Sequence, residues 1–110
     1  MKKKEDLPDC PVATTLQILS SKWKLLIIRN LLVRPWRFNE LKRDLDGISQ
    51  KVLTESLRSM EVDGIILLRE IQSAPPKVVE YSLSPLGETL RPLLTEMQNW
   101  GNYYKEQIGK

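Results

Sequence analysis

The chain has 110 residues and a formal net charge of +3, with no histidine and a single cysteine. This length fits one domain, and the missing residue types argue against zinc fingers, histidine-based catalysis and a disulfide within the chain. The sequence also lacks a glycine-rich phosphate loop and a motif with paired carboxylates. We therefore expect no enzyme activity, no metal site and no cofactor.

No apolar stretch approaches the ~18 residues that a membrane span needs. The basic start, Met1 to Lys4, is not followed by the apolar segment of a secretion signal. The sequence therefore predicts a cytoplasmic protein that does not contact a membrane.

Positive charge is concentrated in the first half of the chain. The segment from Lys22 to Arg43 contains seven Lys or Arg and a single acidic residue, Glu40. From Asp44 onward, ten acidic residues outnumber seven basic ones. A polyanion should therefore meet the first half of the chain and the tip of the later hairpin.

Two helices are predicted in the first third of the chain. Residues 1–9 are charged, and we expect a flexible N-terminus followed by one folded domain over residues 10–110. Pro11 suits the first turn of a helix with the apolar stripe Val12, Leu16 and Leu19. Ser21 can cap a second helix that ends at Pro35. Its expected inward residues are Trp23, Leu26, Ile27 and Leu31, and its expected outward residues are Lys22, Lys24 and Arg29.

The next two helices have the spacing of a helix-turn-helix. Phe38, Leu41 and Leu45 share one helical face, and Asp46-Gly47 ends that helix before Ser49 caps the next. The second helix has an apolar face formed by Val52, Leu53, Ser56, Leu57 and Met60. Its polar face carries Gln50, Lys51, Thr54, Glu55 and Arg58, which can reach base edges and phosphates in a major groove. A solvated face on an amphipathic helix would give the same pattern, but the turn favours DNA binding.

A β-hairpin is predicted after the stop signal Gly64, with strands from Ile65 to Ile71 and from Val78 to Leu83. Its proline-rich loop ends at Lys77, which is either a solvated lysine or a contact to the DNA backbone or minor groove. The fold class is therefore α+β and mainly helical: a winged helix-turn-helix with a two-stranded wing and extra terminal helices for dimerisation. The candidate DNA-binding residues are Arg37, Ser49, Gln50, Lys51, Thr54, Arg58 and Lys77.

A C-terminal helix is predicted over about residues 84–108, starting at Ser84-Pro85. Its apolar residues follow a 3.5-residue repeat, which is typical of a seam for another helix. Pro92 should kink this helix unless its first turn ends nearby. The stripe could pack on its own domain, but its width favours a homodimer interface. The candidate dimerisation residues are Val12, Leu16, Leu90, Leu93, Met97, Trp100 and Tyr104.

The sequence resembles the HxlR-type family of bacterial winged helix-turn-helix regulators along nearly its whole length. The matching motifs are Cys10-Pro11-Val12, Lys22-Trp23, Arg37 to Leu41, Gly47 to Thr54, Leu57-Arg58, Asp63-Gly64, Pro75 to Lys77, Glu80 to Leu83, Gly87 and Trp100. The resemblance implies a homodimer, joined through its terminal helices, that binds operator DNA near genes it represses or activates. Trp36 departs from the family pattern, and we expect it in the core rather than against DNA.

Cys10 is a candidate redox sensor, because some members of the similar family sense oxidants or electrophiles with a cysteine at this position. The positive end of the helix dipole would favour its thiolate, whereas Asp9 would oppose it. The alternative is a buried apolar plug at the helix start. For the whole protein, the alternatives to a DNA-binding regulator are a protein-interaction module and a small-molecule sensor with weak DNA affinity. The sequence names no effector.

Overall fold

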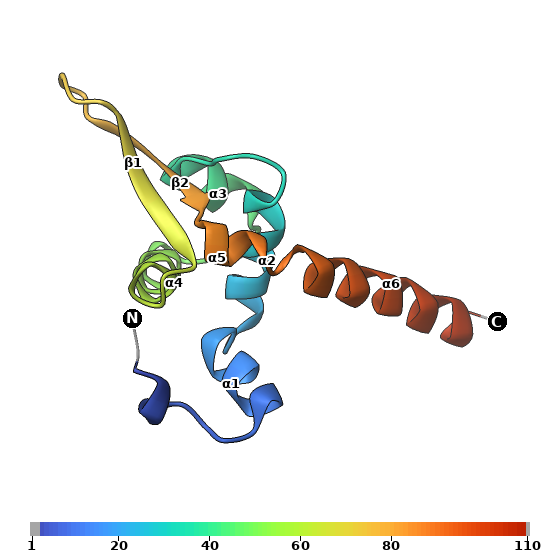
Figure 1. The fold of residues 1–110 in the computed structure, drawn as a ribbon. Helices are drawn as coiled ribbons and strands as arrows, with labels where there is room; N and C mark the ends of the chain where they lie inside the picture. Colours follow the sequence, from blue (N-terminus) through green and yellow to red (C-terminus); the bar gives the residue numbers. More distant parts are fainter. Residues whose placement is uncertain (1–2, 110) are drawn as a thin grey trace.

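The computed structural model describes residues 3–109, which form a small helical body, a β-hairpin and one projecting helix (Figure 1). The elements are a 3-10 turn (Lys4–Asp6), α1 (Pro11–Ile18), α2 (Lys22–Leu31), α3 (Phe38–Asp44), α4 (Gln50–Val62), β1 (Ile66–Gln72), β2 (Val78–Leu83), α5 (Pro85–Glu88) and α6 (Arg91–Ile108). Met1 and Lys2 of the N-terminus expected to be flexible, and Lys110 of the predicted domain, lie outside the described residues. The winged helix-turn-helix class predicted from the sequence is confirmed.

The helix boundaries follow the predicted capping residues. Ser21, Ser49 and Ser84 each accept a backbone hydrogen bond, at 3.3, 3.1 and 2.9 Å, from the residue three positions later. Gly47 in the turn and Gly64 after α4 have φ values of +90° and +77°, which side chains with a Cβ rarely adopt. The sequence therefore specifies where these helices start and stop.

The core lies where α2, α3, α4 and the base of the wing meet. Its fully buried side chains are Ile27, Ile28, Leu41, Leu53, Met60 and Ile66. The prediction that Lys24 points outward is wrong: its side chain is buried, and Nζ donates to Ser20 Oγ at 3.3 Å and to Ser59 Oγ at 2.9 Å. The aliphatic stem fills core space while the ammonium group ties α2 to α4.

The wing is an antiparallel pair in which Ile66 lies opposite Leu83 and Leu68 opposite Tyr81. Its strands begin and end within one residue of the predicted limits. A feature that the sequence did not reveal is an isolated antiparallel bridge between Trp36 and Tyr81, which places the connection before α3 beside β2. The wing is thereby fixed to the helix-turn-helix.

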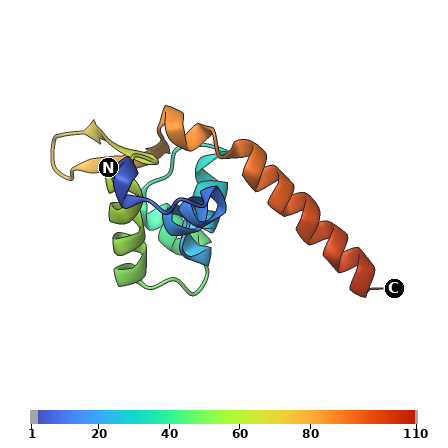
Figure 2. The same cartoon turned by 60° about the horizontal axis from the view of Figure 1, so that its bottom comes forward.

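The predicted C-terminal helix is divided into two. α5 ends at Glu88 and α6 begins at Arg91, because Pro92 lacks a backbone N–H and suits a helix start better than a helix interior. Gly87 lies against the start of the wing, where a Cβ would overlap the Ile65 carbonyl oxygen. α6 then extends away from the body in both ribbon views (Figures 1 and 2), and none of its residues is buried.

Candidate nucleic-acid interface

The second helix of the helix-turn-helix, α4, presents the predicted polar face to solvent. Gln50, Lys51 and Arg58 are exposed and Thr54 is half-buried. The residues buried on the other side are Leu53, Ser56, Leu57 and Met60. Ser49 Oγ accepts the Val52 N–H as the helix cap, which leaves the hydroxyl hydrogen of Ser49 available for an outside acceptor. The helix therefore offers one row of donors and a cationic guanidinium outward.

Arg37 lies at the N-cap of α3, and its side chain is exposed. Its backbone N–H donates to Glu40 Oε1 at 2.8 Å, which fixes the first turn of the helix. This hydrogen bond, with smaller contributions from Arg34, holds the pKa of Glu40 below its ordinary value. The Arg37 guanidinium takes no part in this contact, so it stays available to a phosphate.

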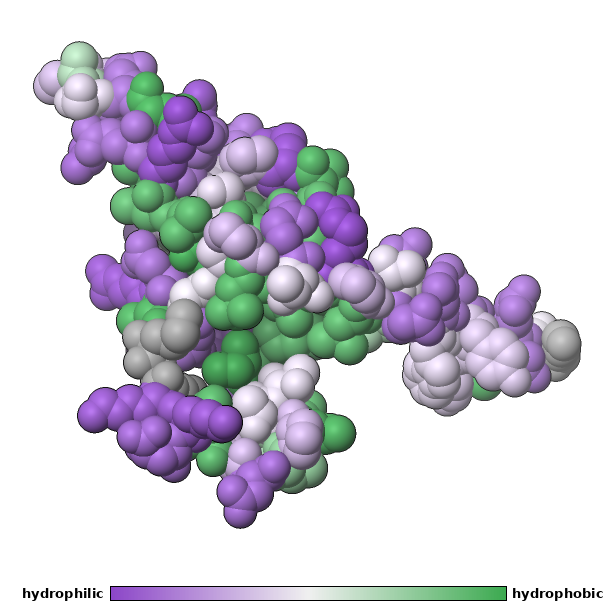
Figure 3. Space-filling model, in the orientation of Figure 1, coloured by the Kyte–Doolittle hydropathy of each residue, from purple (hydrophilic) through white to green (hydrophobic). Residues whose placement is uncertain are grey.

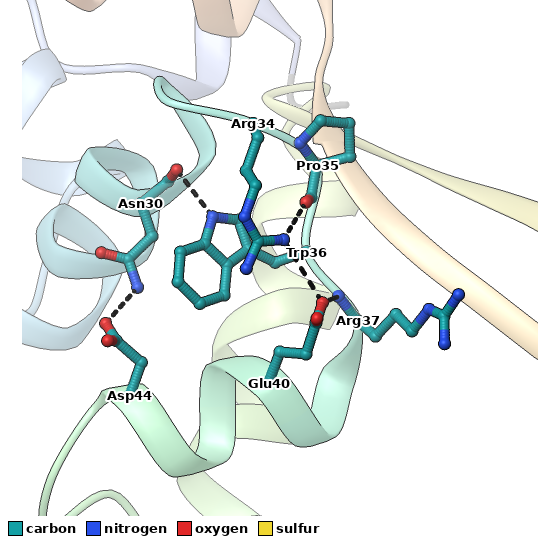
Figure 4. A network of polar contacts seen from close by, with 7 residues as sticks. All are labelled: Asn30, Arg34, Pro35, Trp36, Arg37, Glu40 and Asp44. Carbon is teal, nitrogen blue, oxygen red and sulfur yellow. Dashed lines mark hydrogen bonds and ion pairs between the residues drawn. The ribbon is translucent and has the colours of Figure 1, made fainter.

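A network around Trp36 attaches α3 to α2 (Figure 4). The indole N–H donates to the Asn30 carbonyl at 2.8 Å, and the Asn30 amide donates to Asp44 Oδ2 at 2.7 Å. The Arg34 guanidinium stacks 3.8 Å from the centre of the Trp36 ring. Trp36 packs against the core, as expected from the sequence.

Two of the predicted DNA contacts, Arg37 and Lys77, line one open hollow of about 390 Å3 between α3 and the start of β2. Arg43 and Asn39 line it too, and neither was singled out from the sequence, although Arg43 belongs to the basic run that ends there. Lys77 Nζ also lies 3.5 Å from Glu70 Oε2 on the other strand. Three cations and one carboxylate, Glu40, therefore line a space that an anionic oxygen could enter on its cationic side.

Tyr81 lies on β2, and its phenol is influenced by charges on α4. Its side chain is half-buried, and burial together with the charge of Glu61 raises the pKa of its phenol above the ordinary value. The charge of Arg58 acts in the opposite direction and lowers this pKa. Tyr81 thus relates the wing to α4.

The predicted dimerisation residues lie apart from this surface, on α1 and α6. Val12, Leu16 and Trp100 are 67, 64 and 64% exposed, and Trp100 stacks on Tyr104 of the same helix with ring centres 5.4 Å apart. Leu93, Met97 and Tyr104 are exposed as well, whereas Leu90 is half-buried against the core.

Cys10 is the N-cap of α1, and it is exposed. Its exposure disagrees with the alternative of a buried plug, because the chain before Pro11 runs over the surface. Within residues 3–109 no helix is both long and apolar enough to cross a membrane.

The chain is similar to known helix-turn-helix proteins over most of its length. Residues 18–109 match the model of the HxlR-like helix-turn-helix family. The HTH-type transcriptional regulator YdeP of Bacillus subtilis is 42% identical over 106 residues, which cover 96% of this chain and 82% of YdeP.

Solved structures resemble the chain over a similar length. The redox regulator HypR in its reduced form superposes with a TM-score of 0.84 at 35% identity, covering 91% of this chain and 98% of HypR. The reduced regulator YodB of B. subtilis gives 0.75 at 32% identity, covering 91% and 98%. HypR has also been solved oxidised, and YodB with a bound quinone.

Proposed function

Since the chain belongs to the HxlR-like helix-turn-helix family of transcriptional regulators, we propose that it binds palindromic operators as a homodimer and responds to oxidants or electrophiles. The observation that carries the DNA-binding part of this proposal is the outward polar face of α4, and the basic side chains of the hollow between α3 and β2 support it. A helix of this kind lies in a major groove while neighbouring cations hold the phosphates.

Base reading is assigned to α4. Arg58 has the reach and the paired donors to bind a guanine edge, and Gln50, Lys51 and Thr54 extend the row of contacts toward the helix start. Ser49 lies at the end of the helix where its hydroxyl can meet a phosphate. These roles are supported by exposure on one face.

Phosphate binding is assigned to Arg37 and Lys77, with Arg43 as an addition. The three side chains line the same hollow on two different elements. A phosphate held there would fix the wing and α3 on one DNA strand. The contact carries no sequence information and depends strongly on salt.

Dimerisation is assigned to the exposed apolar residues of α1 and α6. Between residues 3 and 109 these side chains remain largely exposed, and a second copy would bury them about a two-fold axis. Two-fold symmetry would place two recognition helices on half-sites about 10 bp apart or a multiple of it. The expected operator is an imperfect palindrome.

Sensing is assigned to Cys10. Its exposed thiol is the only one in the chain, so oxidation can join the Cys10 residues of two protomers or form a mixed disulfide. In either disulfide two thiols lose two protons and two electrons to the oxidant, and a quinone would instead form a carbon–sulfur bond. The relatives HypR, described as a redox regulator, and YodB, solved with a quinone, support this assignment.

A gel-shift titration on the DNA upstream of the protein's own gene tests the regulator function, with a scrambled fragment of equal length as control. Specific binding should survive competitor DNA and weaken steeply as salt rises, because phosphate contacts release counterions. Equal binding to both fragments, or binding insensitive to salt, would favour a protein-interaction module instead.

A further inference from the structure

A hollow of about 340 Å3 opens where the N-terminal segment, α1, the end of α4 and α5 meet. Leu7, Ile18, Ile65, Leu86 and Leu90 form apolar walls, and Figure 3 shows hydrophobic side chains on this face between α5 and α1. Thr14 and Thr89 also line the hollow, but their hydroxyls donate to the Pro8 and Leu86 carbonyls. The volume lies at the lower end of the ~300–1,000 Å3 range of small-molecule sites. Of the described residues that line the hollow, none is a lysine or arginine.

Asp63 is the one charged residue in this lining. It is only 6% exposed, and none of the hydrogen bonds and ion pairs between residues 3 and 109 involves its carboxylate. The same part of the chain contains no fully enclosed side-chain oxygen without a partner, so the carboxylate must keep some contact with solvent. Asp63 lines the hollow, so the hollow is the space from which a ligand can reach this residue.

The surroundings of Asp63 favour a cation for two separate reasons. A carboxylate among apolar side chains is destabilised unless an opposite charge or strong donor meets it. Asp63 is also the C-cap of the 13-residue helix α4, where the negative end of the helix dipole adds to its charge. A neutral donor would satisfy the hydrogen bonds but would leave the charge uncompensated.

We propose that this hollow binds a small aliphatic ammonium ion, with the ammonium group on Asp63 and the alkyl chain against Leu86 and Leu90. The ligand would act as an effector, because its binding would brace α1 and α5 against the end of α4, directly before the wing begins. This regulatory role rests on the proposed DNA-binding function, whereas the binding site itself does not.

Calorimetric titration of the full chain without DNA tests the site, with hexylammonium as the probe and hexanol and hexanoate as analogues of similar shape. Hexylammonium should bind saturably, about tenfold or more tightly than hexanol, since hydrogen bonds between charged groups are the stronger ones. Hexanoate should not bind. Hexanol and hexylammonium of equal affinity, or no saturable binding of the amine, would overturn the proposal.

Two variants and one control locate the site. Asp63→Asn should abolish the preference for the amine over the alcohol, whereas Glu61→Gln, which removes an exposed carboxylate from the same helix, should keep it. Leu86→Trp should block the hollow and abolish amine binding while Asp63 is retained, so the test stands even if Asp63→Asn fails to fold. Unchanged amine affinity in Leu86→Trp would place the ligand elsewhere and refute the site.

Gel shifts with and without hexylammonium test the effector role. Operator affinity of the wild type should change at least several-fold at saturating amine, and that of Leu86→Trp should not. An unchanged wild-type affinity would overturn the effector role. A protein that binds no DNA at all would refute the proposed function and the effector role with it, while the calorimetry would still decide whether the amine site exists.

Discussion

Trp36 and Tyr81 exchange two backbone hydrogen bonds: the Trp36 N–H donates to the Tyr81 carbonyl at 3.0 Å, and the Tyr81 N–H to the Trp36 carbonyl at 2.7 Å. This pair joins the start of the helix-turn-helix to the wing. The Tyr81 side chain lies near Glu61 and Arg58 of α4, so the same residue relates the wing to the recognition helix. The relative placement of the three elements proposed to touch DNA therefore depends on this contact.

Trp36→Phe should lower the free energy of unfolding by about 1 kcal/mol more than Trp23→Phe does, because only the Trp36 indole donates a hydrogen bond within the described chain, to the Asn30 carbonyl at 2.8 Å. Urea denaturation of both variants measures this difference. An equal loss in the two variants would mean that the Trp36 hydrogen bond contributes nothing beyond ring packing.

Arg58→Ala and Lys77→Ala should weaken operator binding in different ways. Arg58→Ala, which removes the proposed guanine contact, should cost ~1–3 kcal/mol of binding free energy and relax sequence preference at one position in each half-site. Lys77→Ala, which removes the proposed phosphate contact, should lower the dependence of log affinity on log salt concentration by about one. Glu70→Gln should act opposite to Lys77→Ala and strengthen binding to all sequences, because Glu70 lies 3.5 Å from Lys77. Titrations of operator and scrambled DNA at several salt concentrations measure the effects of all three variants. Normal operator binding by Arg58→Ala would refute the proposed contact between Arg58 and a base.

Glu40 should stabilise the fold in a pH-dependent way. Its pKa in the folded protein is lowered below 4.5, chiefly by the hydrogen bond from the Arg37 N–H. Because folding lowers this pKa, the ionised Glu40 carboxylate stabilises the fold fully above pH 4.5. This stabilisation is lost as the pH falls through the pKa of Glu40 in the folded protein. The difference in unfolding free energy between wild type and Glu40→Gln, measured at neutral and acidic pH, should therefore shrink in acid. A difference independent of pH would contradict the role of the ionised carboxylate.

Trp100→Ala should weaken the dimer and leave the protomer intact. The indole is 64% exposed in the protomer, so most of its burial would come from a second copy. A buried interface tryptophan typically contributes about 2–4 kcal/mol. Sedimentation over a range of concentrations measures the loss, with Asn102→Ala on the same helix as control. A wild type that stays monomeric at micromolar concentration, with operator binding unaffected, would refute the dimer.

Cys10→Ser should abolish the response of operator binding to oxidants. Diamide or a quinone should change the wild-type affinity, and non-reducing electrophoresis should show whether diamide links two chains through Cys10. The exposed thiol is accessible to both reagents. Equal responses in the two proteins, or no response in either, would leave Cys10 without a sensing role.

The regular elements of the fold could be predicted because their signals are local. The cap Ser49, the stop Gly64 and the apolar spacing of α4 each act within a few residues of chain. The burial of Lys24 could not be predicted, since its partner Ser59 lies 35 positions away on another helix. Long-range contacts of this kind depend on how the helices pack.

In the candidate site, too, local features could be predicted from the sequence and long-range contacts could not. The outward face of α4 follows from helical phase alone, but the meeting of Arg37 with Lys77 depends on the wing folding back beside α3. The bridge from Trp36 to Tyr81 that enforces this arrangement joins backbone atoms, and backbone pairing leaves little trace in residue type. In the sequence Asp63 stood out only as part of the motif Asp63-Gly64, because the hollow that it lines is formed by residues far apart in the chain.

The close packing of Gly87 on Ile65, together with the hydrogen bond of 2.6 Å from Ser84 Oγ to the Gly64 carbonyl, fixes α5 to the base of the wing just before α6 begins. In the proposed dimer, α6 would then set the distance and the relative rotation between the two α4 helices without touching DNA. One residue inserted between Leu90 and Leu93 would rotate the apolar face of α6 by about 100° relative to the wing. Operator spacing would thus be encoded in the length of a helix remote from every base.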